Sequence, residues 1–247
     1  MKPIKIWNGR PGGGPNPWKV ILVLAELEIP YEHVWVDYSE IKEEPYISLN
    51  PNGRLPAMID PNTDVTLFES GAIINYIIDL YDKDYKLTYG PDQLAEKYLV
   101  QSWLMFQMSG QGPMFGQKMW FAYFHIEENL ISVIDRYKTE VGRICGVIDG
   151  VLRNQRKKLN KSKGDPVWLV GDHHTYADLS FVLWNVLVLP QGDMDFQNDY
   201  PEFWKWHNNL IGLPAVKKVL EYREECIRTL KNSADDVRNR QAYARKL

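Results

Sequence analysis

The chain has 247 residues, of which 45% are hydrophobic and 25% are charged. This is ordinary globular composition, and it excludes collagen-like, disordered and coiled-coil proteins. The formal net charge is −3, so the chain as a whole presents no basic field for nucleic acid, and we expect no nucleic-acid partner.

The first part of the chain alternates between strand and helix patterns. The apolar and alternating runs predict strands at residues 4–7, 33–37, 57–60 and 66–68. A helix is predicted from Pro17 to Leu27, because proline is favoured in the first turn. Isoleucine spacing predicts a second helix from Ser70 to about Tyr81. The order β-α-β, then β-β-α, predicts a small α/β domain ending near residue 82.

From about residue 93 onward the apolar periodicity is helical almost throughout. The predicted helices cover residues 94–107, 126–152, 179–188 and 208–228, the last interrupted by Gly212-Leu213-Pro214. Residues 1–85 carry a net charge of −6 and the remainder a net charge of +3, and a polar linker covers residues 82–92. We therefore expect one domain at residues 1–85, an all-helical domain at 92–231, and a charged, frayed tail at 232–247.

Cysteine usage and hydropathy bear on the cellular compartment. Cys145 and Cys226 are far apart and form no CxxC motif, which fits a reducing compartment. The first residues have no apolar signal core behind them. The most apolar stretch, residues 179–189, is too short for a bilayer, which needs about 20 apolar residues. We expect a cytoplasmic protein with no membrane partner.

Several motifs that carry chemistry in other proteins are not completed in this chain. Gly12, Gly13 and Gly14 are followed by Pro-Asn-Pro, whereas a phosphate-binding P-loop needs Gly-Lys-Ser/Thr. The five histidines form neither an HExxH motif nor a chelating pair with cysteine, so no metal is expected. A flexible strand-to-helix loop near a ligand is compatible with the glycine run.

The segment Phe68-Glu69-Ser70-Gly71 stands where a strand gives way to a helix. Ser70 is a good N-cap residue by type, and that role alone would explain it. Free N–H groups at a helix start also make a carboxylate site, and Glu69 beside them could accept an ammonium group. A ligand with adjacent amino and carboxylate groups would suit both.

Two further segments have simpler interpretations. Thr175-Tyr176-Ala177-Asp178 matches the capping box, and we assign it the structural role of starting a buried helix. Residues 50–56, Asn-Pro-Asn-Gly-Arg-Leu-Pro, form a turn-rich entry into a strand, which composition alone would describe as an ordinary loop.

Taken together, these pieces resemble the glutathione transferases, and one branch in particular. The matching motifs share the order and spacing of that branch over roughly residues 4–228. They are Trp18-Lys19-Val20, residues 50–57, residues 68–73, residues 109–117, residues 166–172 and residues 175–181. The branch contains the bacterial nu-class enzymes and the fungal homologues of the yeast nitrogen-catabolite regulator, a prion protein. The resemblance implies the fold class α/β plus all-α, a thioredoxin-like amino-terminal domain followed by an all-helical domain.

The resemblance implies that a donor after the first strand stabilises the glutathione thiolate. Residues 1–30 contain no Ser, Thr, Tyr or Cys, so the short neutral donors left are Asn8 and Asn16. Asn16 matches the asparagine of the branch's Pro-Asn motif and is the expected catalytic residue. Gly14 stands where many nu-class members have a threonine that also reaches the sulfur.

The same resemblance assigns the other ligand contacts. Leu55 would pair with the cysteinyl backbone of glutathione, with Pro56 cis. Glu69 would hold the γ-glutamyl ammonium and Ser70 the adjacent carboxylate, while Arg54 and Lys42 are candidates for the glycyl carboxylate. The second substrate would contact the helical domain. The residues expected there are Gln107, Gln111, Met114, Phe115, Lys118 and Phe121.

The resemblance therefore implies a homodimeric enzyme that uses glutathione as a co-substrate and activates its thiolate for attack on an electrophile or a disulfide. Two alternatives stay open. One is a glutathione-dependent disulfide reductase or peroxidase. The other is a non-catalytic glutathione-binding regulator of the same fold.

Overall fold

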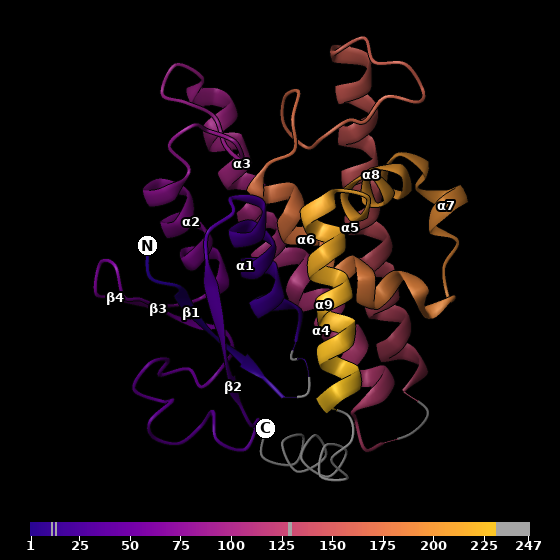
Figure 1. Cartoon of the computed structure of the whole chain (residues 1–247). Coiled ribbons are helices and arrows are strands. Elements are labelled where there is room, and N and C mark those ends of the chain that lie inside the picture. Colours follow the sequence, from indigo (N-terminus) through magenta and orange to yellow (C-terminus); the bar gives the residue numbers. More distant parts are fainter. Residues whose placement is uncertain (11, 13, 128–129, 231–247) are drawn as a thin grey trace. The chain divides into compact units, whose positions relative to one another are not determined.

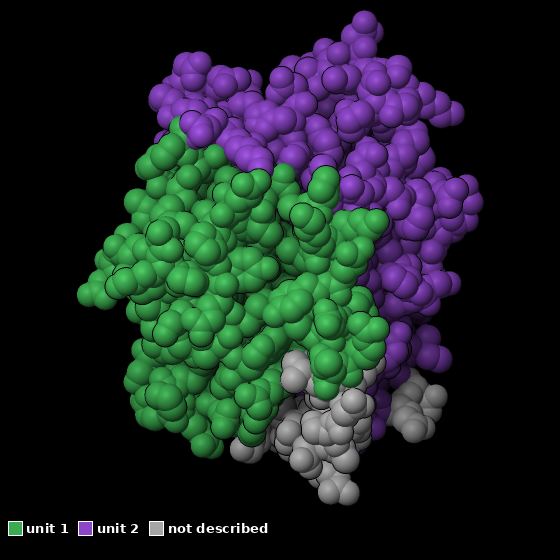
Figure 2. Space-filling view, viewed as in Figure 1, with its two compact units in different colours: residues 1–83, 214–247 green, residues 84–213 purple. Residues whose placement is uncertain are grey.

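The computed structural model describes residues 1–10, 12, 14–127 and 130–230. Two compact units divide the chain: residues 1–83 together with the last described helix, and residues 84–213 (Figure 2). Buried apolar side chains occur in both units.

A mixed sheet forms the centre of the first unit. In the described residues its four strands are β1 (Ile4–Gly9), β2 (Tyr31–Val36), β3 (Ala57–Asp60) and β4 (Val65–Phe68), in the order β2-β1-β3-β4 (Figure 1). The β1–β2 pair is parallel and therefore needs a crossover, which α1 (Pro15–Glu26) supplies. The β1–β3 and β3–β4 pairs are antiparallel. This β-α-β-β-β order, followed by α2, is the thioredoxin-like arrangement that the sequence predicted.

Helix α1 is buried on nearly all sides, because its run from Val20 to Leu24 is wholly apolar. Pro15 and Pro17 occupy its first turn, where a missing backbone N–H costs nothing. The structure therefore starts this helix two residues earlier than the pattern indicated.

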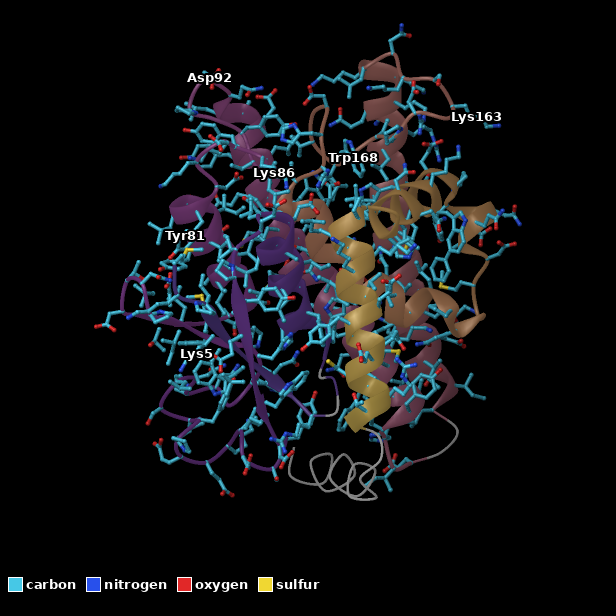
Figure 3. All side chains as sticks on the ribbon, in the orientation of Figure 1. Lys5, Tyr81, Lys86, Asp92, Lys163 and Trp168 are labelled. Carbon is cyan, nitrogen blue, oxygen red and sulfur yellow. The ribbon has the colours of Figure 1, made fainter. Side chains whose placement is uncertain are left out.

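Helix α2 (Ser70–Tyr81) has the predicted bounds and is attached to the β3–β4 hairpin by a buried carboxylate. The Tyr76 hydroxyl donates to Asp60 Oδ2 at 2.8 Å, and the Tyr81 hydroxyl donates to the same oxygen. Tyr81 is labelled on α2 in Figure 3. These bonds fix the sheet edge against α2, whose first turn carries Glu69 and Ser70.

Helix α9 (Pro214–Leu230) belongs to the first unit, although residues 84–213 lie between them in sequence. It packs against α1, and the Tyr222 ring meets the Trp18 ring edge-on at 5.8 Å. Ile227 covers Gly12 so closely that a Cβ at Gly12 would lie 2.4 Å from Ile227 Cγ1. The first unit is thus completed by the last described part of the chain.

The second unit is helical. Its elements are α3 (Leu94–Phe106), a π-helical turn η1 (Gln107–Gln111), α4 (Gly112–Tyr123), α5 (Ile131–Lys158), α6 (Tyr176–Val188), a 3₁₀ turn η2 (Leu189–Gln191), α7 (Phe196–Asp199) and α8 (Pro201–Ile211). Helix α6 is the most buried, and it starts at the predicted capping box formed by Thr175 and Asp178. The predicted fold class is confirmed.

The helix boundaries in the second half of the chain were predicted less well. The helix predicted at residues 126–152 runs instead from 131 to 158, and the side chains of Ile126 and Ile131 are 74% and 68% exposed. The helix predicted at 208–228 is two helices, because Pro214 begins a new one. The expected charged tail at 232–247 lies outside the described residues.

Candidate active site

Asn16 lies in the first turn of α1, four residues after Gly12. It is half-buried, and Gly14 precedes the helix in an extended conformation. The Trp18 Nε1 donates to the Gly12 carbonyl oxygen at 2.5 Å, and Gly12 has a φ of +117°, which favours glycine. The positive end of the helix dipole is therefore next to the Asn16 amide.

Asn8, the other short neutral donor, is in a different environment. It is completely buried at the end of β1, where its Oδ1 accepts a hydrogen bond from the Gly9 amide at 2.9 Å. Its Nδ2 has no hydrogen-bond partner among the described residues. Of the two asparagines, only Asn16 has exposed surface.

Residues 50–56 form a turn that is fixed by its own hydrogen bonds. The Tyr46 hydroxyl and Asn50 Nδ2 both donate to the Arg54 carbonyl oxygen, at 2.6 and 2.7 Å. The Leu55–Pro56 peptide bond is cis, as expected. This holds Leu55 half-buried and leaves the Arg54 side chain exposed.

Lys42 comes from a separate loop to the same turn. Its Nζ donates to the Asn52 carbonyl oxygen at 3.1 Å, and a Cβ on Gly53 would lie 2.7 Å from Lys42 Cδ. The structure thus brings the Lys42 and Arg54 cations to one turn.

The start of α2 differs in one respect from the prediction. Glu69, not Ser70, is the N-cap residue, and Ser70 is the first helical residue with a side chain 3% exposed. The prediction that Ser70 is the N-cap residue is therefore wrong. Glu69 is exposed and has a φ of +65°, a conformation that costs a non-glycine residue about 1–3 kcal/mol. Strain of this kind concentrates at ligand sites.

Lys19 matches the family as part of the Trp18-Lys19-Val20 motif, but the sequence predicted no role for its side chain. It is 1% exposed on α1, and burial lowers its pKa to about 7, while the Glu69 carboxylate acts in the opposite direction. The signal was present, since Lys19 interrupts an otherwise apolar run from Pro17 to Ala25.

Two of the residues expected at the second substrate form a buried amide network in the second unit. Gln107 Nε2 donates to Gln111 Oε1 at 3.1 Å, and Gln111 Nε2 donates to Asn185 Oδ1 at 2.8 Å. Both glutamines are completely buried in the π-helical turn. These amides connect η1 to α6, and a ligand cannot reach them in this structure.

The remaining four expected residues lie on α4. Phe115 is completely buried, and Lys118 is buried with its ammonium 2.9 Å from Gln191 Oε1 and 2.8 Å from Asp193 Oδ2. Met114 and Phe121 are only half-buried. Because a ligand needs exposed surface to contact, we keep only Met114 and Phe121 as candidates.

Two family models, one for each domain of the same enzyme family, match the chain. The glutathione S-transferase N-terminal domain matches residues 2–79, and the glutathione S-transferase C-terminal domain matches residues 112–214. The chain belongs to the glutathione S-transferase family.

Similar proteins occur in fungi. The glutathione S-transferase-like protein tpcF of Aspergillus fumigatus is 41% identical over 221 residues, covering 88% of this chain and 95% of the relative. The protein URE2 of Eremothecium gossypii is 38% identical over 234 residues, covering 83% of this chain and 65% of that protein. The crystal structure of the glutathione transferase URE2P8 from Phanerochaete chrysosporium with oxidized glutathione matches with a TM-score of 0.82 and 35% identity. That match covers 92% of this chain and 98% of the other.

The described part of this transferase contains neither a candidate metal cluster nor a candidate membrane-spanning helix. Its residues contain no group of three or more His, Cys, Asp and Glu side chains that could hold a metal ion. Nor do they include a helix of the length and apolarity that a membrane crossing requires.

Proposed function

We propose that this transferase binds glutathione in its first unit and stabilises the thiolate with the Asn16 side-chain amide. The observation that carries the proposal is which side chains near the first strand could donate a hydrogen bond to the sulfur. Residues 1–30 contain no Ser, Thr, Tyr or Cys, and Asn8 is completely buried, whereas Asn16 has exposed surface in the first turn of α1.

The magnitudes are sufficient for this role. A free thiol has a pKa of about 8.5, and lowering it by about two units needs about 2.7 kcal/mol. A hydrogen bond to a charged group supplies about 1.5–3 kcal/mol, and a helix N-terminus adds about 0.3–1 kcal/mol. No general base is needed.

The proposal places the two ends of glutathione at the strained start of α2 and at the 50–56 turn. Glu69 accepts from the γ-glutamyl ammonium, and Ser70 with the first turn of α2 holds the adjacent carboxylate. Exposure of Glu69 and its positive φ support this role. Lys42 and Arg54 hold the glycyl carboxylate, which their shared turn supports.

The backbone of Leu55, next to Pro56, pairs with the cysteinyl residue of glutathione. In this arrangement the Asn16 amide donates to the sulfur. In the second unit, Met114 and Phe121 contact the second substrate.

In the reaction the thiolate attacks an electrophilic carbon. A C–S bond forms, and the leaving group departs with its electron pair. For an activated alkene, the π bond breaks instead, its electron pair moves to the activating group, and solvent supplies the proton. The thiol proton passes to solvent when glutathione binds.

The second candidate is a glutathione-dependent disulfide reductase or peroxidase. Burial raises the pKa of both cysteine thiols, Cys145 and Cys226, so neither offers a reactive thiolate. The bound thiolate would attack a disulfide sulfur, release the other sulfur as a thiolate, and leave a mixed disulfide for a second glutathione to resolve. The oxidized glutathione in the URE2P8 structure favours this candidate.

A non-catalytic regulator is the third candidate, and Gly14 favours it. Many nu-class members have a threonine hydroxyl here, and this chain has none. A regulator would bind glutathione without lowering the pKa of its thiol.

We further propose a cytoplasmic homodimer of the nu-class type. The free, buried cysteines fit a reducing compartment. Helix α3 exposes the large apolar side chains of Leu94, Tyr98, Leu99 and Met105, a surface that a second copy could cover.

The test is the thiolate ultraviolet absorbance of bound glutathione across pH, followed by turnover with an aryl halide and with a disulfide. The wild type should show a thiol pKa well below the free value, and Asn16→Ala should lose most of that shift while retaining affinity. Ser70→Ala should lose affinity and keep the shift. Asn16→Ala with an unchanged pKa and unchanged turnover would exclude the proposed mechanism.

Gly14→Thr is the matched variant that adds the hydroxyl found in many nu-class members. No atom of the described residues lies within 4 Å of a Cβ at Gly14, and its φ of −72° suits any residue, so a side chain can begin there without strain. It should lower the thiol pKa further. A wild type that binds glutathione with an unshifted pKa would favour the regulator.

A further inference from the structure

A buried ion pair ties the middle of α4 to the segment that follows α6. Lys118 lies on α4 and is 2% exposed. Its ammonium is 2.8 Å from Asp193 Oδ2 and 2.9 Å from Gln191 Oε1. Both partners belong to residues 189–195, which connect α6 to α7. The ammonium therefore joins two segments that are far apart in sequence.

The 189–195 segment is attached to α6 as well. Gln191 Nε2 donates to the Leu187 carbonyl oxygen at 3.1 Å, in the last turn of α6. The Asp193 side chain is 33% exposed, so the ion pair reaches from the buried side of α4 to the surface. A series of contacts thus runs from the end of α6 through Gln191 and Lys118 to α4.

An ion pair at this position does something that an apolar contact would not. Replacing a buried ion pair by apolar residues is often neutral or stabilising, because the two charges must leave water to form it. What the pair adds is direction, since an ammonium needs its acceptors at defined distances and angles. The Lys118 pair therefore favours one arrangement of α4 against the 189–195 segment.

Lys118 lies between the two residues proposed to contact the second substrate. Met114 precedes it by four residues and Phe121 follows it by three, so the three side chains are neighbours on one face of α4. The start of α4 has a different support, since a Cβ on Gly116 would lie 3.1 Å from the Trp184 ring. The ion pair is thus the contact that fixes the part of α4 between Met114 and Phe121.

We infer that Lys118 is a positioning residue for the second substrate. Its pair with Asp193 holds α4 and the 189–195 segment in register, and this sets where Met114 and Phe121 meet the substrate. The inference rests on the proposed function, because it extends the same site. Lys118 is buried and does not touch the substrate itself.

The class of substrate follows from the same residues. Met114 and Phe121 are half-buried and offer a thioether and an aromatic ring. The positive charge between them is neutralised by Asp193. The substrates that this surface favours therefore carry an uncharged apolar or aromatic group.

Binding of two S-substituted glutathiones tests the inference without requiring turnover. The probes are S-benzylglutathione and S-methylglutathione, which differ by one phenyl ring and are alike in the rest of the molecule. Their dissociation constants are measured by calorimetry on the full chain. The ratio of the two constants reports the contacts of the ring alone.

Three variants and one control are compared. Lys118→Met keeps most of the side-chain volume and removes the ammonium, and Asp193→Asn removes the charge of its partner. Lys118→Arg keeps the positive charge. The control Arg143→Met breaks an exposed ion pair with Glu140 on α5. Urea unfolding of each variant establishes that it is folded.

The wild type should bind S-benzylglutathione about 10-fold more tightly than S-methylglutathione. Lys118→Met and Asp193→Asn should reduce this preference to about twofold or less, with affinity for S-methylglutathione within about twofold of the wild type. Lys118→Arg should retain more of the preference than Lys118→Met, because it can still pair with Asp193. Arg143→Met should retain all of it.

Three outcomes would overturn the inference while glutathione binding stands. One is a wild-type preference that survives in folded Lys118→Met and Asp193→Asn. Another is an equal loss of affinity for both probes, which would assign the pair a general structural role. The third is a wild type without any preference, which would also exclude the contacts at Met114 and Phe121.

A variant that does not fold leaves the test intact. If Lys118→Met does not fold, Asp193→Asn decides, because Asp193 lies partly at the surface and its amide keeps the shape of the side chain. A wild type that binds neither probe nor glutathione would overturn the proposed function, and the inference with it.

Discussion

Asp178 holds together three separate parts of the second unit, and removing its carboxylate should show how much they depend on it. The carboxylate is completely buried and accepts four hydrogen bonds. Oδ1 accepts from the Leu169 amide at 3.0 Å and from Trp206 Nε1 at 2.8 Å. Oδ2 accepts from the amide and the hydroxyl of Thr175, both at 2.9 Å.

Asp178→Ala leaves these four buried donors without their acceptor. Each unsatisfied buried donor costs about 1–3 kcal/mol, so even the low end gives about 4 kcal/mol in total. That is a large part of the roughly 5–15 kcal/mol that stabilises a typical domain. Thr175→Ala removes only the helix cap, and it should cost about 1 kcal/mol.

The assay is urea unfolding of both variants and of the wild type, followed by tryptophan fluorescence and by far-ultraviolet circular dichroism. Two probes are needed because the chain has two compact units, which need not unfold together. The reasoning would be refuted if Asp178→Ala cost no more than Thr175→Ala, since the bonds to Leu169 and Trp206 would then contribute nothing.

Two further predictions concern the first unit and the acid stability of the chain. Gly12→Ala should lose about 1–3 kcal/mol of stability, because its Cβ would meet Ile227 at 2.4 Å and its φ is +117°. The control Gly14→Ala should change stability by less than about 0.5 kcal/mol, and equal losses in urea midpoint would contradict this account. Burial lowers the pKa of both His33 and His207 from 6.5 to about 4, so the unfolded chain binds more protons between these values. The stability that the two neutral histidines contribute is fully present above pH 6.5 and is lost as the pH falls towards 4. This change in the free energy of unfolding is about 3 kcal/mol for the nearly inaccessible His207 and less for the partly exposed His33. His207→Gln should flatten the acid limb of the unfolding profile, and an unchanged limb would exclude His207 as its cause.

The sequence predicted those parts of the fold in which local pattern and burial agree. Helix α2 was found with its correct bounds because isoleucines recur on one buried face. The start of α5 was wrong because Ile126 and Ile131 continue the apolar pattern and yet lie exposed. The π-helical turn had no local signal, since its burial depends on Asn185, far away in sequence.

The candidate site shows the same division. The 50–56 turn and the Glu69–Ser70 junction could be predicted as motifs, because each is formed by residues that are adjacent in sequence. The burial of Lys118 was not visible, since its partners Gln191 and Asp193 come from a distant segment.

The two-part composition of the first unit has a consequence for how the chain is made. During synthesis, β1 to α2 leave the ribosome early, while α9 follows only after residues 84–213. Until then Trp18 lacks the ring of Tyr222, and the loop at Gly12 lacks the cover of Ile227. The second unit is in effect an insertion into the first, so a chain interrupted anywhere between residues 84 and 213 leaves its amino-terminal unit without α9.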